Sequence, residues 1–119
     1  MTERGYNAMK YFVTNKERQG TCYHEFYKGK WDGKTFWRDD SICLHDDVLW
    51  ECPGFEEAIR TVISSYDPFG ETEITQCQWE EIGRLIEDKD AMSKEIYAEA
   101  NMWAGGVYKS HDCFTILGI

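Results

Sequence analysis

The spacing of the apolar residues changes along the chain, and this change restricts the possible folds more than any other feature of the sequence. From Phe55 to Tyr66 the apolar residues recur at intervals of three and four positions, directly after a break at Pro53-Gly54. Such spacing places them on one face of a helix, so we predict a helix over residues 55–65. The first third of the chain contains short aromatic and β-branched runs instead, which favour strands.

Strands are expected at the beginning of the chain, over residues 9–14, 21–28 and 41–44. Asp32-Gly33 stands between two aromatic-rich pairs and is typical of a two-residue hairpin turn, so we predict a hairpin that joins residues 30–31 to 35–37. Residues 46–51 fit either a strand or a helical turn.

Two further helices are expected, over residues 75–87 and 90–104. Thr75 and Gln78 have the spacing of a capping box, and Gly105-Gly106 is a natural end for the last helix. Asp67-Pro68-Phe69-Gly70 is expected to form a turn. The apolar run at residues 113–118 is typical of a buried strand that returns to the sheet.

Strands followed by helices and one returning strand indicate an α+β fold. We predict an antiparallel sheet with about three helices packed on one face, and Trp79 and Ile82 buried between the layers. The 119 residues contain no repeat and no linker, so residues 1–119 are expected to form one domain.

The net charge of −9 is unevenly distributed, with +2 over residues 1–45 and −11 over residues 46–119. Such acidity repels nucleic acid and attracts a basic partner, although acidity can also serve solubility alone. No apolar run has the length of a membrane span, and none follows the N-terminus as in a signal peptide. We therefore expect no membrane association, no nucleic-acid partner and a cytoplasmic location.

Five cysteines, an odd number without a Cys-x-x-Cys pair, indicate reduced and mostly buried thiols rather than disulfides. Cys43 and His45 would share one face of a strand, beside Asp39-Asp40 and Asp46-Asp47. A structural zinc site needs four ligands, usually in two short pairs, and only one pair is present. We expect no metal and no cofactor.

No catalytic residue is predicted. Ser110-His111-Asp112 contains the residue types of a hydrolase triad, but neighbours on an extended chain point to opposite sides. His24 is expected to be a hydrogen-bonded core or edge residue. A cysteine nucleophile paired with His24 or His111 remains open, because such partners meet only in the fold. The bases and aromatics of residues 23–37 fit a hairpin better than a nucleic-acid surface, since acids dilute their charge.

The exposed faces of the second and third predicted helices are strongly acidic. If their acids form one patch, we expect that patch to bind a basic partner. The predicted partner-binding residues are Glu80, Glu81, Glu87, Asp88, Glu95 and Glu99.

Three segments of the chain resemble small bacterial proteins: Phe55-Glu56-Glu57-Ala58-Ile59, residues 66–75, and Gln78-Trp79-Glu80-Glu81-Ile82. Within residues 48–86 the chain is similar to immunity proteins of polymorphic toxin and contact-dependent growth inhibition systems. The resemblance implies a protein that binds and inhibits a cognate toxin domain, often a basic nuclease, and it transfers no catalytic residue.

The alternative is a small ligand-binding or enzymatic domain. Its pocket would lie between the sheet and the helices and would be lined by His24, Cys43 or His45. Nothing in the sequence indicates an oligomeric state.

Overall fold

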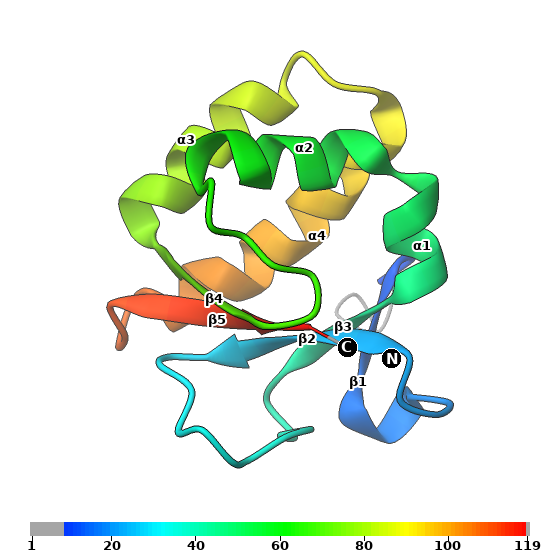
Figure 1. The fold of residues 1–119 in the computed structure, drawn as a ribbon, viewed down its shortest axis with the longest axis vertical. Helices are drawn as coiled ribbons and strands as arrows, with labels where there is room; N and C mark the ends of the chain where they lie inside the picture. The colour runs from blue at the N-terminus through cyan, green and yellow to red at the C-terminus, as the bar shows by residue number, and fades with distance from the viewer. Residues whose placement is uncertain (1–8, 119) are drawn as a thin grey trace, which may run out of the picture.

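The computed structural model describes residues 9–118, which form one five-stranded antiparallel sheet and four α-helices (Figure 1). The strands are β1 (Phe12–Thr14), β2 (Tyr23–Lys28), β3 (Ile42–His45), β4 (Glu71–Thr75) and β5 (Cys113–Leu117). The helices are α1 (Asp46–Glu51), α2 (Pro53–Val62), α3 (Gln76–Ile86) and α4 (Ala91–Val107), and a 3-10 turn η2 (Asn15–Glu17) follows β1.

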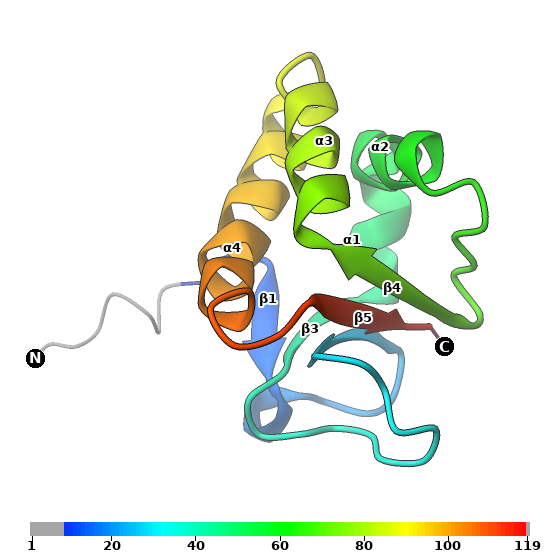
Figure 2. The ribbon, with the colours of Figure 1, turned by 90° about the vertical axis from the view of Figure 1, so that its left-hand side faces the viewer.

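The helices cover one face of the sheet, as the side view in Figure 2 shows. The strand order is β1-β3-β2-β5-β4, so β5 lies between β2 and β4. Phe26 and Phe114 stack in the centre of the core with ring centroids 5.7 Å apart, and Trp79 meets Phe114 edge-on at 5.2 Å. The predicted α+β architecture, the returning C-terminal strand and the burial of Trp79 and Ile82 are therefore confirmed.

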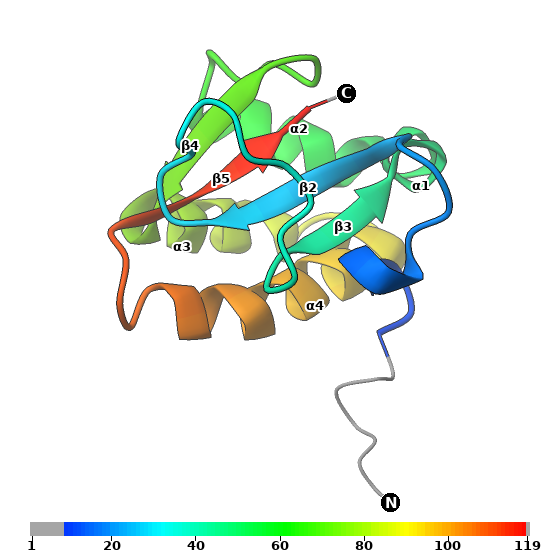
Figure 3. The same cartoon turned by 90° about the horizontal axis from the view of Figure 1, so that it is seen from below.

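The connection between β2 and β3, residues 29–41, lies over the second face of the sheet, on the viewer's side of the strands in Figure 3. The anchor of this connection is Glu25, whose side chain is buried with 1% exposure. The Glu25 carboxylate accepts hydrogen bonds from the backbone N–H groups of Trp37 (2.7 Å) and Arg38 (2.9 Å) and from the Ser41 hydroxyl (2.6 Å). A buried carboxylate with three donors fixes this segment in place.

The predicted hairpin at Asp32-Gly33 is wrong, because residues 29–41 contain no strand. The Asp32 carboxylate accepts hydrogen bonds from the N–H groups of Lys34 and Thr35 and from the Thr35 hydroxyl, which closes a local turn. These bonds hold the pKa of Asp32 at about 2. The N–H of Trp37 is bonded to Glu25, so it cannot join a strand ladder.

The predicted helix end at Gly105-Gly106 is also wrong, because α4 continues to Val107. Val107 is 1% exposed, and the hydroxyl of Tyr108 donates to the backbone carbonyl of Ile74 at 2.8 Å. Tertiary packing of the last turn thus outweighs the preference of glycine for a helix end.

Three other segments differ from expectation in extent or type. Residues 46–51, left open between strand and helix, form α1, where the His45 ring nitrogen accepts the N–H of Asp47 at 3.0 Å as an N-cap. Strand β4 was not predicted, although Thr72 and Ile74 alternate with exposed neighbours. The first strand covers only residues 12–14 of the predicted 9–14. Within residues 9–118, no helix has the length and apolar character needed to cross a membrane.

Candidate functional site

The structure does not bring the six predicted acids into one patch. Glu80, Glu81, Glu87 and Asp88 are exposed along α3 and at its C-terminal end. Tyr97 of α4 stacks on Trp79 of α3 at 4.4 Å, so this side of α4 faces α3. Glu95 and Glu99 contact β1 and the residues before it instead.

Glu99 and Glu95 have structural roles at the start of the chain. The Glu99 carboxylate accepts hydrogen bonds from the backbone N–H groups of Lys10 (2.7 Å), Tyr11 (3.0 Å) and Phe12 (3.2 Å), which explains why the first strand begins only at residue 12. Glu95 accepts a hydrogen bond from the Tyr11 hydroxyl and lies 3.6 Å from the Lys10 amine. The Tyr11 hydrogen bond, and then the charge of Lys10, lower the pKa of Glu95. These contacts place Glu95 and Glu99 against residues 10–12, whereas Glu80, Glu81, Glu87 and Asp88 are exposed on α3 and just after it; partner binding by these acids stays a prediction.

A different surface of the described residues exposes two large aromatic side chains. Trp50 and Phe69 are each 76% exposed, and both flank one small pocket between α1, α2 and the turn before β4. We name it the aromatic-rimmed pocket; its volume is about 220 Å³, and it is lined by Asp46, Leu49, Trp50, Glu56, Arg60, Pro68 and Phe69. Large apolar side chains this exposed and this close together mark interaction surfaces more often than isolated ones do.

Trp50 is presented by a helix whose position is fixed at its first residue. The Asp46 N–H donates to the carbonyl of Cys22 at 2.9 Å, and the Asp46 carboxylate lies 2.8 Å from Nε2 of His24. Leu49 is 5% exposed and turns toward the core, so the next residue, Trp50, points outward. The ties from α1 to β2 therefore hold the indole at the surface.

Phe69 is presented by a rigid turn at the predicted position. The Asp67 side chain accepts the N–H of Phe69 at 2.9 Å, and the Asp67 carbonyl accepts the N–H of Gly70 at 3.1 Å. Gly118, after β5, donates its N–H to the Gly70 carbonyl at 2.6 Å, and a Cβ on Gly118 would overlap the carbonyl oxygen of Pro68. This close contact fixes the turn, so the exposure of Phe69 belongs to the folded structure.

Two carboxylates line the pocket. Within the described residues, Glu56 is paired with an arginine, and Asp46 is not. Glu56 lies 3.3 Å from the Arg60 guanidinium, which also lies over the ring of Tyr66 at 5.3 Å. Burial raises the pKa of Tyr66, so it remains a neutral phenol against the arginine. Asp46 has no Lys or Arg within ion-pair distance in residues 9–118, and its only side-chain partner there is His24.

His24 is buried, with 1% exposure, on the helix-facing side of β2. Its Nδ1 has no hydrogen-bond partner in the described part of the chain, so the one hydrogen bond of the ring there is the contact of Nε2 with Asp46. The gap beside His24 has no room for a water molecule. His24 therefore orients the Asp46 carboxylate and has no path to a ligand of its own.

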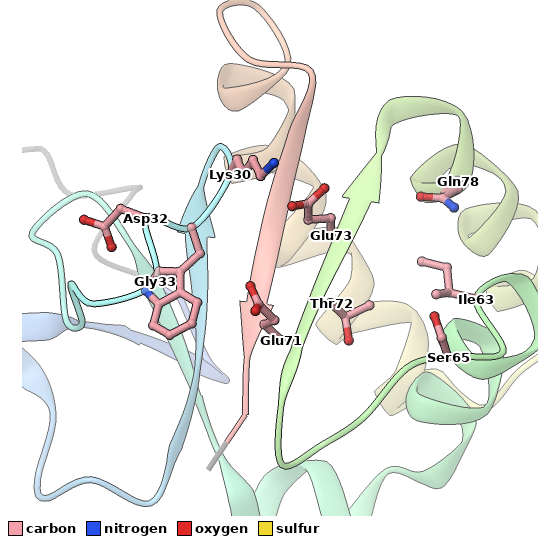
Figure 4. Close-up of a pocket in the computed structure, with 10 residues that line it drawn as sticks. Lys30, Asp32, Gly33, Ile63, Ser65, Glu71, Thr72, Glu73 and Gln78 are labelled. Carbon is pink, nitrogen blue, oxygen red and sulfur yellow. The ribbon is translucent and has the colours of Figure 1, made fainter.

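A second groove runs along β4 and is wider and more open than the aromatic-rimmed pocket. Figure 4 shows Lys30, Asp32 and Gly33 on one side, Ile63, Ser65 and Gln78 on the other, and Glu71, Thr72 and Glu73 between them. Its volume is about 560 Å³ and its lining is mainly polar. Exposed acids on an open strand surface are readily solvated. We therefore expect this groove to contribute less to the binding of a partner than Trp50 and Phe69 do.

The other sequence candidates do not converge. Ser110 Oγ lies 2.9 Å from His111 Nδ1, but Asp112 makes no hydrogen bond to either ring nitrogen in the described chain. Cys43 and His45 lie on the sheet face opposite the helices, and His45 serves as the cap of α1. Residues 9–118 hold no group of three or more His, Cys, Asp or Glu side chains placed to bind a metal.

Three of the five cysteines are buried, in agreement with the expectation of mostly buried thiols, and two are exposed. Cys22 and Cys77 are exposed, whereas Cys43, Cys52 and Cys113 are buried. Burial raises the pKa of Cys43 to about 12 and also raises the pKa of Cys113.

We expect iodoacetamide at pH 8 to modify Cys22 and Cys77 rapidly in the folded protein and the three buried thiols only after unfolding, because the thiolate is the reactive form. Mass spectrometry of peptides after timed labelling measures this. A Cys22→Ser/Cys77→Ser variant serves as control and should retain no fast thiol. Rapid labelling of Cys43 in the folded protein would contradict the core packing.

Trp50 and Phe69 were not predicted as site residues. Their types suggested the core, and only the tertiary structure leaves them uncovered. The weak signal was position, since Phe69 stands inside a Pro-containing turn and Trp50 in a segment with no clear periodicity. A scan against protein-family models and searches of curated proteins and of solved structures found no match to this chain.

Proposed function

We propose that this chain is a binding protein that docks onto a basic protein partner through the surface around the aromatic-rimmed pocket. The observation that carries the proposal is the pair Trp50 and Phe69, each 76% exposed on the rim of one pocket. Tryptophan is enriched among the few residues that dominate interface energies. Hydrogen bonds fix the backbone that carries both residues, so little backbone entropy is lost when a partner covers them.

Charge supports a basic partner. Residues 46–69 contain six acidic residues and a single basic residue, Arg60. Complementary charge raises association rates and disfavours acidic competitors. The four exposed acids on α3 and just after it add to the negative charge of the helical layer, in which Figure 2 shows α3 between α2 and α4.

The proposed class of function is inhibition: this chain would act as an immunity-type protein that blocks its partner, a toxin domain. The resemblance to immunity proteins covers residues 48–86, a region that includes both Trp50 and Phe69. A pocket of about 220 Å³ is smaller than the ~300–1,000 Å³ typical of small-molecule sites. It suits one side chain of a protein partner better than a substrate or cofactor.

The test uses the purified protein and the C-terminal domain of a large secreted protein, which we expect the neighbouring reading frame to encode. We expect the two to form a complex whose association slows as salt increases. The variant Glu81→Lys/Asp88→Lys should fold normally, because surface changes usually alter stability by less than ~0.5 kcal/mol.

We expect this variant to associate more slowly at low salt, with little change in dissociation, because these acids would act at the rim. Stopped-flow kinetics at low and high salt measures both rates, and the high-salt experiment is the internal control. Unchanged association at low salt would remove α3 from the binding account. Failure of the neighbouring protein to bind at any salt concentration would overturn the proposal itself.

A further inference from the structure

We infer that the aromatic-rimmed pocket receives a single cationic side chain of the partner, an arginine or a lysine, whose charged group binds the Asp46 carboxylate. This inference rests on the proposed function and names the chemistry that the pocket selects. It follows from three properties of the pocket: its walls, its charge and the state of the Asp46 oxygens.

The walls suit the stem of a long basic side chain. Trp50 and Phe69 provide two aromatic surfaces, and Leu49 and Pro68 add further apolar lining. The methylene groups of arginine and lysine cover apolar surface while their charged heads reach polar groups. A cation within about 6 Å of an aromatic ring centroid is attracted by the ring, most strongly in the case of tryptophan.

The charge of the pocket favours a cation over an anion or a neutral group. Glu56 and Arg60 lie 3.3 Å apart and largely cancel each other. Arg60 also lies over the Tyr66 ring, so it is occupied within the protein. The remaining charge in the lining belongs to Asp46, whose side chain is 29% exposed.

The hydrogen bonds of Asp46 leave one oxygen available to a ligand. Oδ1 accepts from Nε2 of the buried His24 at 2.8 Å. Oδ2 makes no hydrogen bond to any residue of the range 9–118. A carboxylate that lines the pocket, is oriented by one buried partner and has a second oxygen without a hydrogen bond in the described residues can accept from a guanidinium or an ammonium. His24 is therefore a positioning residue for this interaction.

An apolar side chain is the competing occupant, because Trp50 and Phe69 would also pack against leucine or phenylalanine. The two occupants differ in their dependence on Asp46. A cation loses its partner when Asp46 becomes neutral, whereas an apolar side chain gains because covering the pocket no longer removes a charge from water.

The experiment titrates the folded protein with Nα-acetyl-arginine methylamide and, as the matched uncharged probe, Nα-acetyl-citrulline methylamide. Amide chemical shifts in ¹⁵N–¹H spectra report the site. We expect saturable millimolar binding of the arginine probe, with shifts concentrated in residues 46–50 and 66–70. The citrulline probe should bind at least about tenfold more weakly, because it lacks the charge that both the aromatic rings and the carboxylate attract.

Two variants form the second arm. Asp46→Asn retains an oxygen for His24 but removes the charge, and we expect it to lose the preference for arginine over citrulline. Asp47→Asn makes the same change one residue later, at an 85% exposed side chain outside the pocket lining, and should retain that preference. The comparison of the two probes on the unaltered protein stands even if Asp46→Asn folds poorly.

Equal binding of the two probes, no saturable binding of arginine, or shifts concentrated in α3 would each overturn the inference. These failures differ from failure of the proposed function. If Asp46→Asn binds the protein partner normally while Trp50→Ala and Phe69→Ala do not, the docking surface stands and the cationic occupant is wrong. If the aromatic variants also bind the partner normally, the proposed surface is wrong.

Discussion

Replacement of Glu25 by alanine is expected to lower the free energy of unfolding by about 3 kcal/mol or more, since each buried donor left without a partner costs roughly 1–3 kcal/mol. The substitution removes the acceptor of the Trp37 and Arg38 N–H groups and of the Ser41 hydroxyl. It also releases Trp37, which adopts a left-handed backbone conformation with φ of 61° that non-glycine residues disfavour. Urea denaturation followed by tryptophan fluorescence measures the change.

The matched control for this substitution is Glu73→Ala. Glu73 is also a strand glutamate, but it is exposed in β4. Its replacement should alter stability by less than ~0.5 kcal/mol. Equal stability of the Glu25 and Glu73 variants would show that residues 29–41 are not anchored as described.

The second large effect concerns binding. Replacement of both Trp50 and Phe69 by alanine is expected to weaken partner binding at least about a hundredfold, because central aromatic residues of interfaces commonly contribute about 2 kcal/mol or more each. Folding should change little, since each side chain is 76% exposed and leaves no cavity when it is shortened. Isothermal titration calorimetry with the confirmed partner measures the affinity.

Met102→Ala is the control for the loss of exposed apolar surface, because Met102 is 83% exposed on α4 and lies outside the lining of the pocket. It should leave affinity within about twofold, as expected for a residue outside the interface. If the Met102 variant and the double variant bind alike, exposed apolar area in general, rather than this pocket, governs the affinity.

The helical part of the fold was predictable because local and tertiary signals agree there. In α2 the apolar spacing, with Phe55 and Ile59 on one face, coincides with the face that packs on the core. In α3 the capping box of Thr75 and Gln78 fixes the start, and both of its hydrogen bonds form. Long periodic segments contain several such independent signals.

The errors arose where a distant residue decides the local structure. The Asp32-Gly33 pair forms a turn, but Glu25 takes the N–H groups that a hairpin would need. Glu99 does the same to the amides of Lys10 and Tyr11, which shortens β1. A hydrogen bond between a side chain and backbone groups far away in the sequence leaves no periodic pattern of residues. The spacing of apolar residues therefore cannot reveal it.

The candidate site was only partly visible in the sequence for the same reason. The acidic character of residues 46–119 is a property of composition and could be counted. Whether acids share a surface depends on how helices pack, and the packing separates Glu95 and Glu99 from the acids of α3. The exposure of Trp50 and Phe69 depends on which surface the other elements leave open.

The central claim, that the partner covers the aromatic-rimmed pocket, is tested most directly by deuterium exchange of the complex with the confirmed partner. We expect partner binding to slow exchange in residues 46–51 and 66–70, the two segments that present Trp50 and Phe69. Protection in these segments should be lost in the Trp50→Ala/Phe69→Ala variant under the same conditions. Protection confined to residues 76–88 or to residues 29–41, with 46–51 and 66–70 exchanging as in the free protein, would contradict the account.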